Sequence, residues 1–547
     1  MNLMNCDACG ITSGYDLILP EPPVPHLLKS NDYPRDEDAE SIRKVLQQVD
    51  SDLKPLISEI DRLKAIVADL EAARETLVNF DKEHRAMLSP IRRFPSEILQ
   101  AIFLHCLPDR HLEDSFDIWD VKQAPWVLTQ VCRRWRSVSM GYTRLWEHVV
   151  LHATSLKRPI RGRLQLLQTH IDRAGKLSLR VRLHSEYDRK EDRDLVDVLV
   201  LHSLRWQLLE LNVPVALFKR LRSIHDRLPR LQKLKVYVQN YHAEDLSYMF
   251  GNTPALQEVK LVVIPFYDVY PTFPYRQLLR FAGGYNVALA LSVLQQSESL
   301  VDCKLSVYER ENYIRMPASS FRMSSLRTLD LRVERSYKIL TYLDLPALEE
   351  LCLECIERPR GVDFHEGPLR PTLLLQMLQR SSPPLQKLLI QGSFWSQDEF
   401  MSLLRTIPSV RKLQLSVIQH MVDFSTLIYN ADTVTGVSDA RPSPLVPRLL
   451  DLSFEVHSQL NVDGLLDMIE SRYRIAHPSN PSPSPHYNPT PAQLQSCHVR
   501  TAASFQPSIM TIVRLEKLRS EGMDVFITDQ RYSQPIPACP SRGLSSR

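Results

Sequence analysis

The chain has 547 residues, 44% of them hydrophobic and 24% charged, which is enough for two or three cores or for one elongated repeat domain. Lys and Arg number 67 against 64 Asp and Glu, so no global charge favours a nucleic acid or an anionic membrane as a partner. Nine cysteines are too few, and odd in number, for a secreted disulfide scaffold.

Residues 1–35 are predicted to be irregular, because five prolines prevent any long element there. The segment lacks the basic and continuous apolar regions of a signal peptide. No stretch of the chain approaches the roughly 18–20 uninterrupted apolar residues of a membrane span. We therefore expect an intracellular protein without a membrane contact, and the sequence does not distinguish cytoplasm from nucleus.

Two pairs of cysteines have the Cys-x-x-Cys spacing found in zinc sites, Cys6/Cys9 and Cys352/Cys355. Zinc takes four ligands, usually from two such pairs at a defined separation, and neither pair has a second one nearby. Cys352 and Cys355 also fall on and just after a predicted strand, where cysteine acts as a small hydrophobic residue. The sequence therefore predicts neither a metal nor another cofactor, and leaves the role of Cys6 and Cys9 open.

Residues 36–88 are predicted to form a coiled-coil helix. Pro55 is expected in the first turn of the longer of two helices, where its missing N–H is harmless. Beyond Pro55, apolar residues recur at alternating steps of four and three, as in the a/d seam of a coiled coil, and Arg74 interrupts the series, which consists of Leu56, Ile60, Leu63, Val67, Leu70 and Leu77. Such a helix can pair with a second copy to give a homodimer, or pack on another part of the same chain.

A small all-α unit is predicted for residues 89–151. Its two helical patterns carry apolar residues at Ile98, Leu99, Ile102 and Phe103, and then at Val127, Leu128, Val131, Cys132 and Trp135. A region of roughly 50 residues rarely buries a sufficient core alone. This unit must therefore pack on the rest of the chain or complete its core with a partner.

From residue 175 to residue 475 a motif of the form Leu-x-x-Leu-x-Leu recurs, usually after Pro or Ser. Its central positions are predicted at residues 209, 234, 259, 279, 303, 329, 351, 388, 413 and 452. Most intervals lie within the range of about 20–29 residues typical of leucine-rich repeats, and amphipathic helical segments lie between the motifs. Because neither a lone strand nor a lone helix can bury its apolar face, these units are expected to stack into a curved α/β solenoid.

A doubly wound α/β domain is the alternative fold, although no glycine-rich phosphate loop follows any predicted strand. Residues 476–507 are rich in Pro and Ser and are predicted to be a disordered insert. This insert is either a plain flexible loop or a phosphorylated one, with Ser482, Ser484 and Thr490 each preceding a proline. Residues 508–547 are expected to close the array with a helix and a strand, followed by a tail.

The pattern Phe94-Pro95-x-Glu97-Ile98-Leu99-x-x-Ile102-Phe103, followed by Val131-Cys132-x-x-Trp135, resembles an F-box. Its place between a predicted coiled coil and degenerate leucine-rich repeats resembles the F-box proteins that are abundant in mushroom-forming fungi. The resemblance covers residues 35–460. Two features depart from the family: Phe94 stands where Leu is usual, and residues 109–123 lengthen the interval between the two halves of the motif.

The resemblance implies a non-catalytic substrate-recognition adaptor of an SCF-type ubiquitin ligase. A Skp-family adaptor, and through it a cullin ligase core, would bind at Phe94, Pro95, Ile98, Leu99, Ile102, Leu128, Val131, Cys132 and Trp135. The repeats would hold an unknown protein substrate near a ubiquitin thioester carried by another subunit.

Two other functions remain as alternatives. The chain can bind a Skp-family adaptor as a scaffold outside a cullin ligase, or use the F-box-like motif only for internal packing. An enzyme with its site on the repeat surface is the other alternative, but the sequence has no His-Glu-x-x-His motif, P-loop or nucleophile turn. We therefore predict no catalytic residues.

Overall fold

The computed structural model describes residues 4–5, 12–13, 19–108, 117–152, 160–238, 243–263, 271–308, 317–334, 337–355, 371–391, 396–418, 424–428, 445–456, 461–474, 492–501 and 508–529. The secondary structure is mixed α/β, as predicted. The chain divides into two compact units, Met1–Ile98 and Leu99–Arg547, and the boundary falls within a helix.

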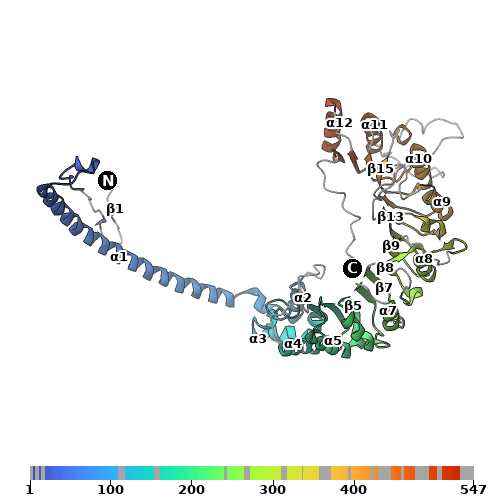
Figure 1. Cartoon of the computed structure of the whole chain (residues 1–547), viewed down its shortest axis with the longest axis horizontal. Helices are drawn as coiled ribbons and strands as arrows, with labels where there is room; N and C mark the ends of the chain where they lie inside the picture. The colour runs from blue at the N-terminus through green and yellow to red at the C-terminus, as the bar shows by residue number, and fades with distance from the viewer. Residues whose placement is uncertain are drawn as a thin grey trace. The chain divides into compact units, whose positions relative to one another are not determined.

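One long helix, α1 (Asp36–Met87), makes up most of the first unit (Figure 1), and the predicted long N-terminal helix is therefore confirmed. The smaller elements of this unit are an antiparallel pair of short strands and two 3-10 turns: β1 (Met4–Asn5), β2 (Thr12–Ser13), η1 (Leu27–Lys29) and η2 (Pro90–Arg93). Cys6 and Cys9 lie outside the described residues.

Pro55 lies inside α1, so the prediction that it begins a second helix was wrong. The apolar series on its two sides belong to one helix of 52 residues, about 78 Å long at 1.5 Å per residue. The helix tolerates Pro55 because the lost hydrogen bond is local, while helix-forming residues continue on both sides. No side chain of α1 is buried.

The second unit opens with short helices: α2 (Ser96–His105), which begins in the first unit, η3 (Val127–Thr129), α3 (Arg133–Gly141) and η4 (Thr143–Trp146). Residues 96–146 are called the helical segment below. Part of the lengthened interval within it, residues 109–116, lies outside the described residues.

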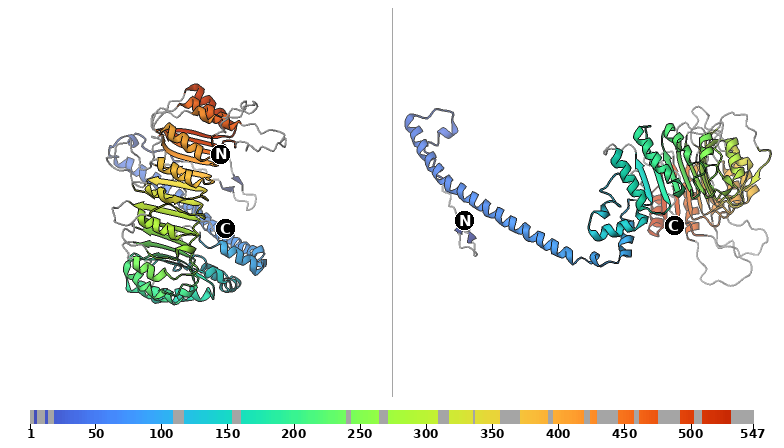
Figure 2. Two further views of the ribbon diagram at one scale, coloured as in Figure 1. Left: turned by 90° about the vertical axis from the view of Figure 1, so that its right-hand side faces the viewer. Right: turned by 90° about the horizontal axis from the view of Figure 1, so that it is seen from below.

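Among the described residues, fourteen strands form one parallel sheet, and their order in the sheet is their order along the chain (Figure 2). They are β3 (His148–His152), β4 (Leu179–His184), β5 (Trp206–Asn212), β6 (Lys233–Val238), β7 (Glu258–Val263), β8 (Arg280–Asn286), β9 (Asp302–Tyr308), β11 (Thr328–Val333), β13 (Glu350–Cys355), β14 (Lys387–Ile390), β15 (Lys412–Ile418), β16 (Asp451–Val456), β17 (Ser496–Thr501) and β18 (Asp524–Asp529). A separate parallel pair consists of β10 (Phe321–Arg322) and β12 (Leu343–Asp344). The doubly wound alternative was wrong, because strand order reverses in such a sheet and does not reverse here.

The helices of the repeats lie on the outer side of an arc whose inner side is the sheet (Figure 1). They are α4 (Ile160–Arg173), α5 (Lys190–Leu201), α6 (Val215–Arg220), α7 (Ala243–Phe250), α8 (Val287–Gln296), α9 (Pro371–Ser381), α10 (Gln397–Thr406), α11 (Val462–Tyr473) and α12 (Ile509–Ser520); the 3-10 turns among them are η5 (Ser203–Arg205), η6 (Leu221–Ile224), η7 (Tyr275–Gln277), η8 (Lys338–Tyr342) and η9 (Phe424–Leu427). The inner side, from which Arg182, Glu210 and Lys235 project, is called the helix-free face.

One row of side chains, each at most 2% exposed, crosses all fourteen strands. It consists of Val149, Val181, Leu209, Leu234, Val259, Phe281, Cys303, Leu329, Leu351, Leu388, Leu413, Leu452, Cys497 and Val525. The predicted central position 279 was wrong, because Phe281 occupies the row. Gly283 takes the next inward position of β8, opposite Leu305, and the rings of Phe281 and Tyr285 stack across it with centroids 6.0 Å apart. A Cβ on Gly283 would lie within 3.2 Å of both rings.

The sheet extends beyond the predicted limits of 175 and 475 at both ends. At the first end, β3 falls within the predicted helical unit 89–151. At the other end, β17 falls within the predicted disordered insert 476–507 and pairs with a strand on each side, so that prediction was wrong for residues 496–501. Cys497, Val499 and Thr501 alternate inward, which is the period of a strand. Ser482, Ser484 and Thr490 lie outside the described residues.

Candidate partner-binding surfaces

The nine residues predicted to contact an adaptor differ widely in exposure. Exposed side chains are Pro95, Ile98 (47%), Val131 (55%) and Cys132; half-buried ones are Phe94, Ile102 and Trp135; buried ones are Leu99 and Leu128. Met140 on α3, which sequence reasoning did not select, is also exposed (45%). The described structure therefore leaves only part of the predicted set available to another protein.

Leu99 and Leu128 were predicted as adaptor contacts, and the structure buries both side chains. They are 0% and 4% exposed, so they belong to the core of the chain. Successive residues of a helix point about 100° apart, so Ile98 and Leu99 cannot both face the same way. The sequence pattern did not show which of the two points inward, whereas the structure buries Leu99 together with Phe103, one turn later.

Cys132 and Trp135 have roles within the helical segment itself. The Cys132 Sγ caps α3 by accepting a hydrogen bond from the backbone N–H of Trp135 at 3.4 Å. The Trp135 ring packs against Phe103 with centroids 4.8 Å apart. Arg136 Nε donates to the carbonyl of Thr129 at 2.8 Å, which ties α3 to the preceding turn. Substituting Trp135 would therefore disturb packing within the helical segment.

Four side chains, here called the aromatic joint, connect the helical segment to the first helix of the repeats. Trp126 and Trp146 meet edge to face at 5.0 Å, and the His170 ring from α4 lies 5.1 Å from Trp146. The Arg173 guanidinium lies 4.8 Å and 4.5 Å from the centroids of the two indole rings, at cation–π distance. Trp146 is fully buried. The helical segment thus completes its core on its own chain, one of the two outcomes expected from its small size.

The described part of the lengthened interval also packs on the sheet. Ile118 is fully buried and donates its backbone N–H to the carbonyl of Val150 on β3 at 3.2 Å. The Trp126 indole N–H donates to the carbonyl of Ile118 at 3.0 Å. These contacts cover part of the outer edge of β3, so this portion of the interval stabilises the first strand.

Burial shifts the pKa values of two titratable groups in this region in opposite directions. Burial raises the pKa of Asp117 to about 7, although the backbone N–H of Trp119 stabilises its carboxylate. Burial lowers the pKa of His170 to about 4, so this ring is neutral at physiological pH, and its Nε2–H donates a hydrogen bond to the His148 carbonyl at 2.9 Å. Asp117 therefore destabilises the fold at pH values at which it is ionised, and His170 does so at pH values at which it is protonated.

Asp117→Asn is expected to stabilise the chain at pH 8 by roughly 1–3 kcal/mol and to change little at pH 4. The unfolded Asp117 ionises near pH 4 and the folded one near pH 7, so stability is lost as the pH rises between these values. Urea unfolding of both proteins from pH 4 to pH 8 measures the difference, and the contribution of His170 cancels because both carry it. A constant difference across this range would contradict the assignment.

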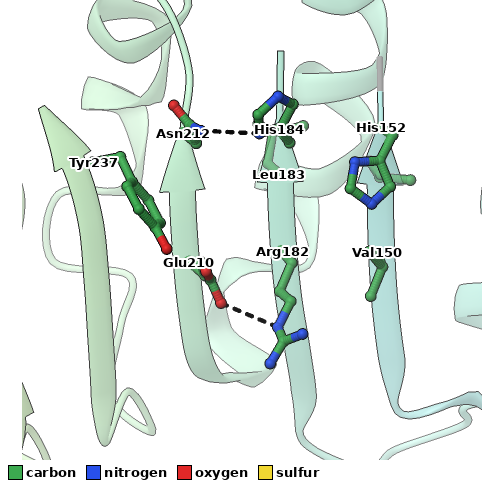
Figure 3. Close-up of a pocket in the computed structure, with 9 residues that line it drawn as sticks. Val150, His152, Arg182, Leu183, His184, Glu210, Asn212 and Tyr237 are labelled. Carbon is green, nitrogen blue, oxygen red and sulfur yellow. Dashed lines mark hydrogen bonds and ion pairs between the residues drawn. The ribbon is translucent and has the colours of Figure 1, made fainter. Parts of the chain in front are cut away.

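A pocket of about 190 Å³ lies on the helix-free face across β3–β6 (Figure 3). Its lining residues are Val150, Leu151, His152, Arg182, Leu183, His184, Glu210, Asn212 and Tyr237. The Asn212 side chain hydrogen-bonds His184 Nδ1 at 3.0 Å, and Arg182 pairs with Glu210 at 3.1 Å. Small-molecule sites usually occupy about 300–1,000 Å³, so this pocket is smaller than most of them.

The described residues contain no cluster of three or more His, Cys, Asp or Glu side chains that could hold a metal ion. Of the second Cys-x-x-Cys pair, Cys352 is buried and Cys355 lies 3.8 Å from the Glu334 carbonyl, and neither is in a disulfide bond. Within the part of the chain that the structure describes, every helix is too short or too polar to cross a membrane.

No family model matches the chain, and no curated protein matches its sequence significantly.

Proposed function

We propose that the chain is the substrate receptor of an SCF-type ubiquitin ligase, with a Skp-family adaptor bound at the F-box-like motif. One observation supports this most directly: Ile98 and Val131, two apolar positions of the motif, stay exposed (47% and 55%). The same segment buries Trp126 and Trp146 almost completely, so it has a core and still leaves apolar side chains outside it. Burying a fully exposed side chain of this size contributes about 1.5–3 kcal/mol, so covering the exposed half of each contributes roughly half of that.

In this function the chain performs no covalent chemistry. The leucine-rich-repeat-like sheet holds the substrate, and the ligase core brings a ubiquitin thioester to it, so the gain in rate comes from proximity. The aromatic joint supports such a role because it ties the helical segment to the first repeat by packing rather than by a flexible linker. A substrate bound on the sheet would then keep a fixed distance from α3.

The alternative is a Skp-binding scaffold that acts outside a cullin ligase. The burial of Leu99 and Leu128 favours a reduced adaptor contact, because two of the predicted anchors serve the chain's own core. Affinity purification of the full chain from cells tests both functions. Adaptor together with cullin supports the receptor, adaptor without cullin supports the scaffold, and absence of the adaptor rejects both.

We also propose that α1 pairs with α1 of a second copy as a parallel coiled coil. Because α1 runs through Pro55, the steps of four and three continue from Ile42 to Leu70, and no side chain along them is buried. Beyond Pro55, Ile60 and Val67 occupy one set of seam positions and leucines the other, as in parallel dimers, whereas before Pro55 the leucines and the β-branched residues exchange sets. At the flanking positions, Glu59 would lie opposite Lys64 of the second helix.

Leu63→Asp with Leu70→Asp is expected to convert the dimer into a monomer, because two charges would enter each side of the seam. Light scattering coupled to size exclusion should give about twice 63.1 kDa for the wild type and one chain mass for the variant. Ser58→Asp with Ala65→Asp is the matched control, since both residues lie opposite the seam, and it should stay dimeric. A monomeric wild type at micromolar concentration would reject the pairing.

A further inference from the structure

The helix-free face is charged, and its charge is unevenly distributed between the two ends of the sheet. On β4–β9, seven cationic side chains of the described strands project from this face against three carboxylates: Arg180, Arg182, Lys233, Lys235, Lys260, Arg280 and Lys304 against Glu210, Glu258 and Asp302. From β11 to β18 the balance reverses, with Arg332, Lys387, Lys412 and Arg500 against Asp330, Glu350, Glu354, Asp451, Glu455 and Asp524. A chain with almost no net charge therefore presents a basic patch on β4–β9.

Ion pairs offset only part of this positive charge, including one with Glu147 beside β3, which lies 3.9 Å from Arg180. Glu210 lies between two cations, 3.1 Å from Arg182 and 2.7 Å from Lys235. Glu258 is placed in the same way, 3.3 Å from Lys233 and 3.6 Å from Arg280. One carboxylate shared by two cations neutralises only one of them.

Asp302, the third carboxylate, offsets the positive charge of the patch least. Burial raises the pKa of Asp302, which disfavours its charged form. Lys260 on β7 is exposed, and Lys304, on the same strand as Asp302, is 43% exposed and lies 3.8 Å from Asp330. These two lysines continue the row of cationic side chains toward the middle of the sheet.

The dimensions of the patch fit an extended peptide. Adjacent strands are about 4.8 Å apart, so the five intervals from β4 to β9 span about 24 Å. An extended chain advances about 3.3–3.6 Å per residue and would cross this distance with about seven residues. The pocket of about 190 Å³ opens at the β3–β6 end of the same face, where Arg182 and His184 line it (Figure 3).

We propose that the helix-free face of β4–β9 binds an extended acidic segment of a partner protein, with one side chain of that segment in the pocket. A peptide can place carboxylates over the cations and uncharged residues over Glu210 and Glu258. A nucleic acid has a phosphate at every nucleotide, and some phosphates would meet these carboxylates. The site does not depend on adaptor binding, so it can be tested with the full chain alone.

Fluorescence anisotropy of a labelled Glu-Ser repeat peptide of about twelve residues, titrated with the full chain, tests the site. The Glu-Ser peptide is expected to bind at least tenfold more tightly than a Gln-Ser peptide of equal length, and binding should weaken as NaCl is raised. Lys260→Glu with Lys304→Glu should reduce its affinity at least tenfold. Lys387→Glu with Lys412→Glu, the matched charge reversal on β14 and β15, should change it less than twofold.

Absence of peptide binding, or an equal effect of the two double variants, would overturn the proposal. Tighter binding of a single-stranded thymidine oligonucleotide than of the Glu-Ser peptide would assign the patch to nucleic acid and overturn it as well. Adaptor purification with the same variants is scored separately, so failure of the peptide site and failure of the ligase function give different results.

Discussion

Replacing Trp146 with alanine is expected to lower the free energy of unfolding of the second unit by about 3–5 kcal/mol, the usual range for a fully buried tryptophan. Trp146 is 0% exposed and contacts Trp126, His170 and Arg173 at once. The substitution would also leave the Ser139 carbonyl without the indole N–H, which donates to it at 2.9 Å. Urea denaturation followed by intrinsic fluorescence and by circular dichroism measures the change.

Tyr33→Ala is the matched control for the loss of an aromatic ring, since Tyr33 is 91% exposed, and its effect should stay within about 0.5 kcal/mol. The Trp146→Ala variant also tests whether the aromatic joint holds the helical segment on α4. If the aromatic joint carries the packing between the segment and α4, Trp146→Ala should raise amide exchange in both β3 and α4. A loss below about 1 kcal/mol, with exchange unchanged in α4, would contradict the joint.

Ile98→Asp combined with Val131→Asp is expected to abolish adaptor association while leaving the fold intact. Both side chains are about half exposed, so the change costs little within the chain, whereas two carboxylates in an apolar interface would each meet a large desolvation penalty. Association should fall at least a hundredfold in a binding titration with purified adaptor.

Leu201→Asp with Leu204→Asp is the control for that variant, because these leucines are similarly exposed (66% and 50%) and lie on α5 and η5 outside the motif. It should bind the adaptor as the wild type does. Retained binding by the Ile98 and Val131 variant, with unchanged thermal stability, would remove the motif from the interface. Trp135 is less useful in this test, because it packs on Phe103.

Periodicity in the sequence predicted the long helix and the strand-and-helix repeats. Apolar residues recur with the spacing of the face that each element buries, and this spacing differs between a helix and a strand. It placed the strand of Phe281 two residues too early, because Gly283 removes one of the two large residues that mark a strand, and packing between Phe281 and Tyr285 replaces it. It missed β17, because the Pro/Ser-rich composition before it hides a short alternating pattern.

The candidate sites could be predicted less completely. The motif indicated which residues form the helices of the segment. Which of the two side chains, Ile98 or Leu99, is buried depends on the residues that pack against α2, and the motif does not show these. The aromatic joint joins Trp146 to residues 24 and 27 positions later, and no local pattern connects them. The basic patch arises from register: Lys235 and Arg182 are 53 residues apart, and both flank Glu210 only because β4, β5 and β6 are neighbours.

The order of the strands also bears on how this protein is made. Each strand of the large sheet pairs only with the strands before and after it in sequence, so the sheet can lengthen as successive repeats leave the ribosome. β3 and the aromatic joint would be complete before most of the repeats are synthesised, and they offer the first surface on which β4 and β5 can dock. A nascent chain stalled in the middle of the array would therefore display a finished helical segment together with an unpaired strand edge, the kind of edge that chaperones protect.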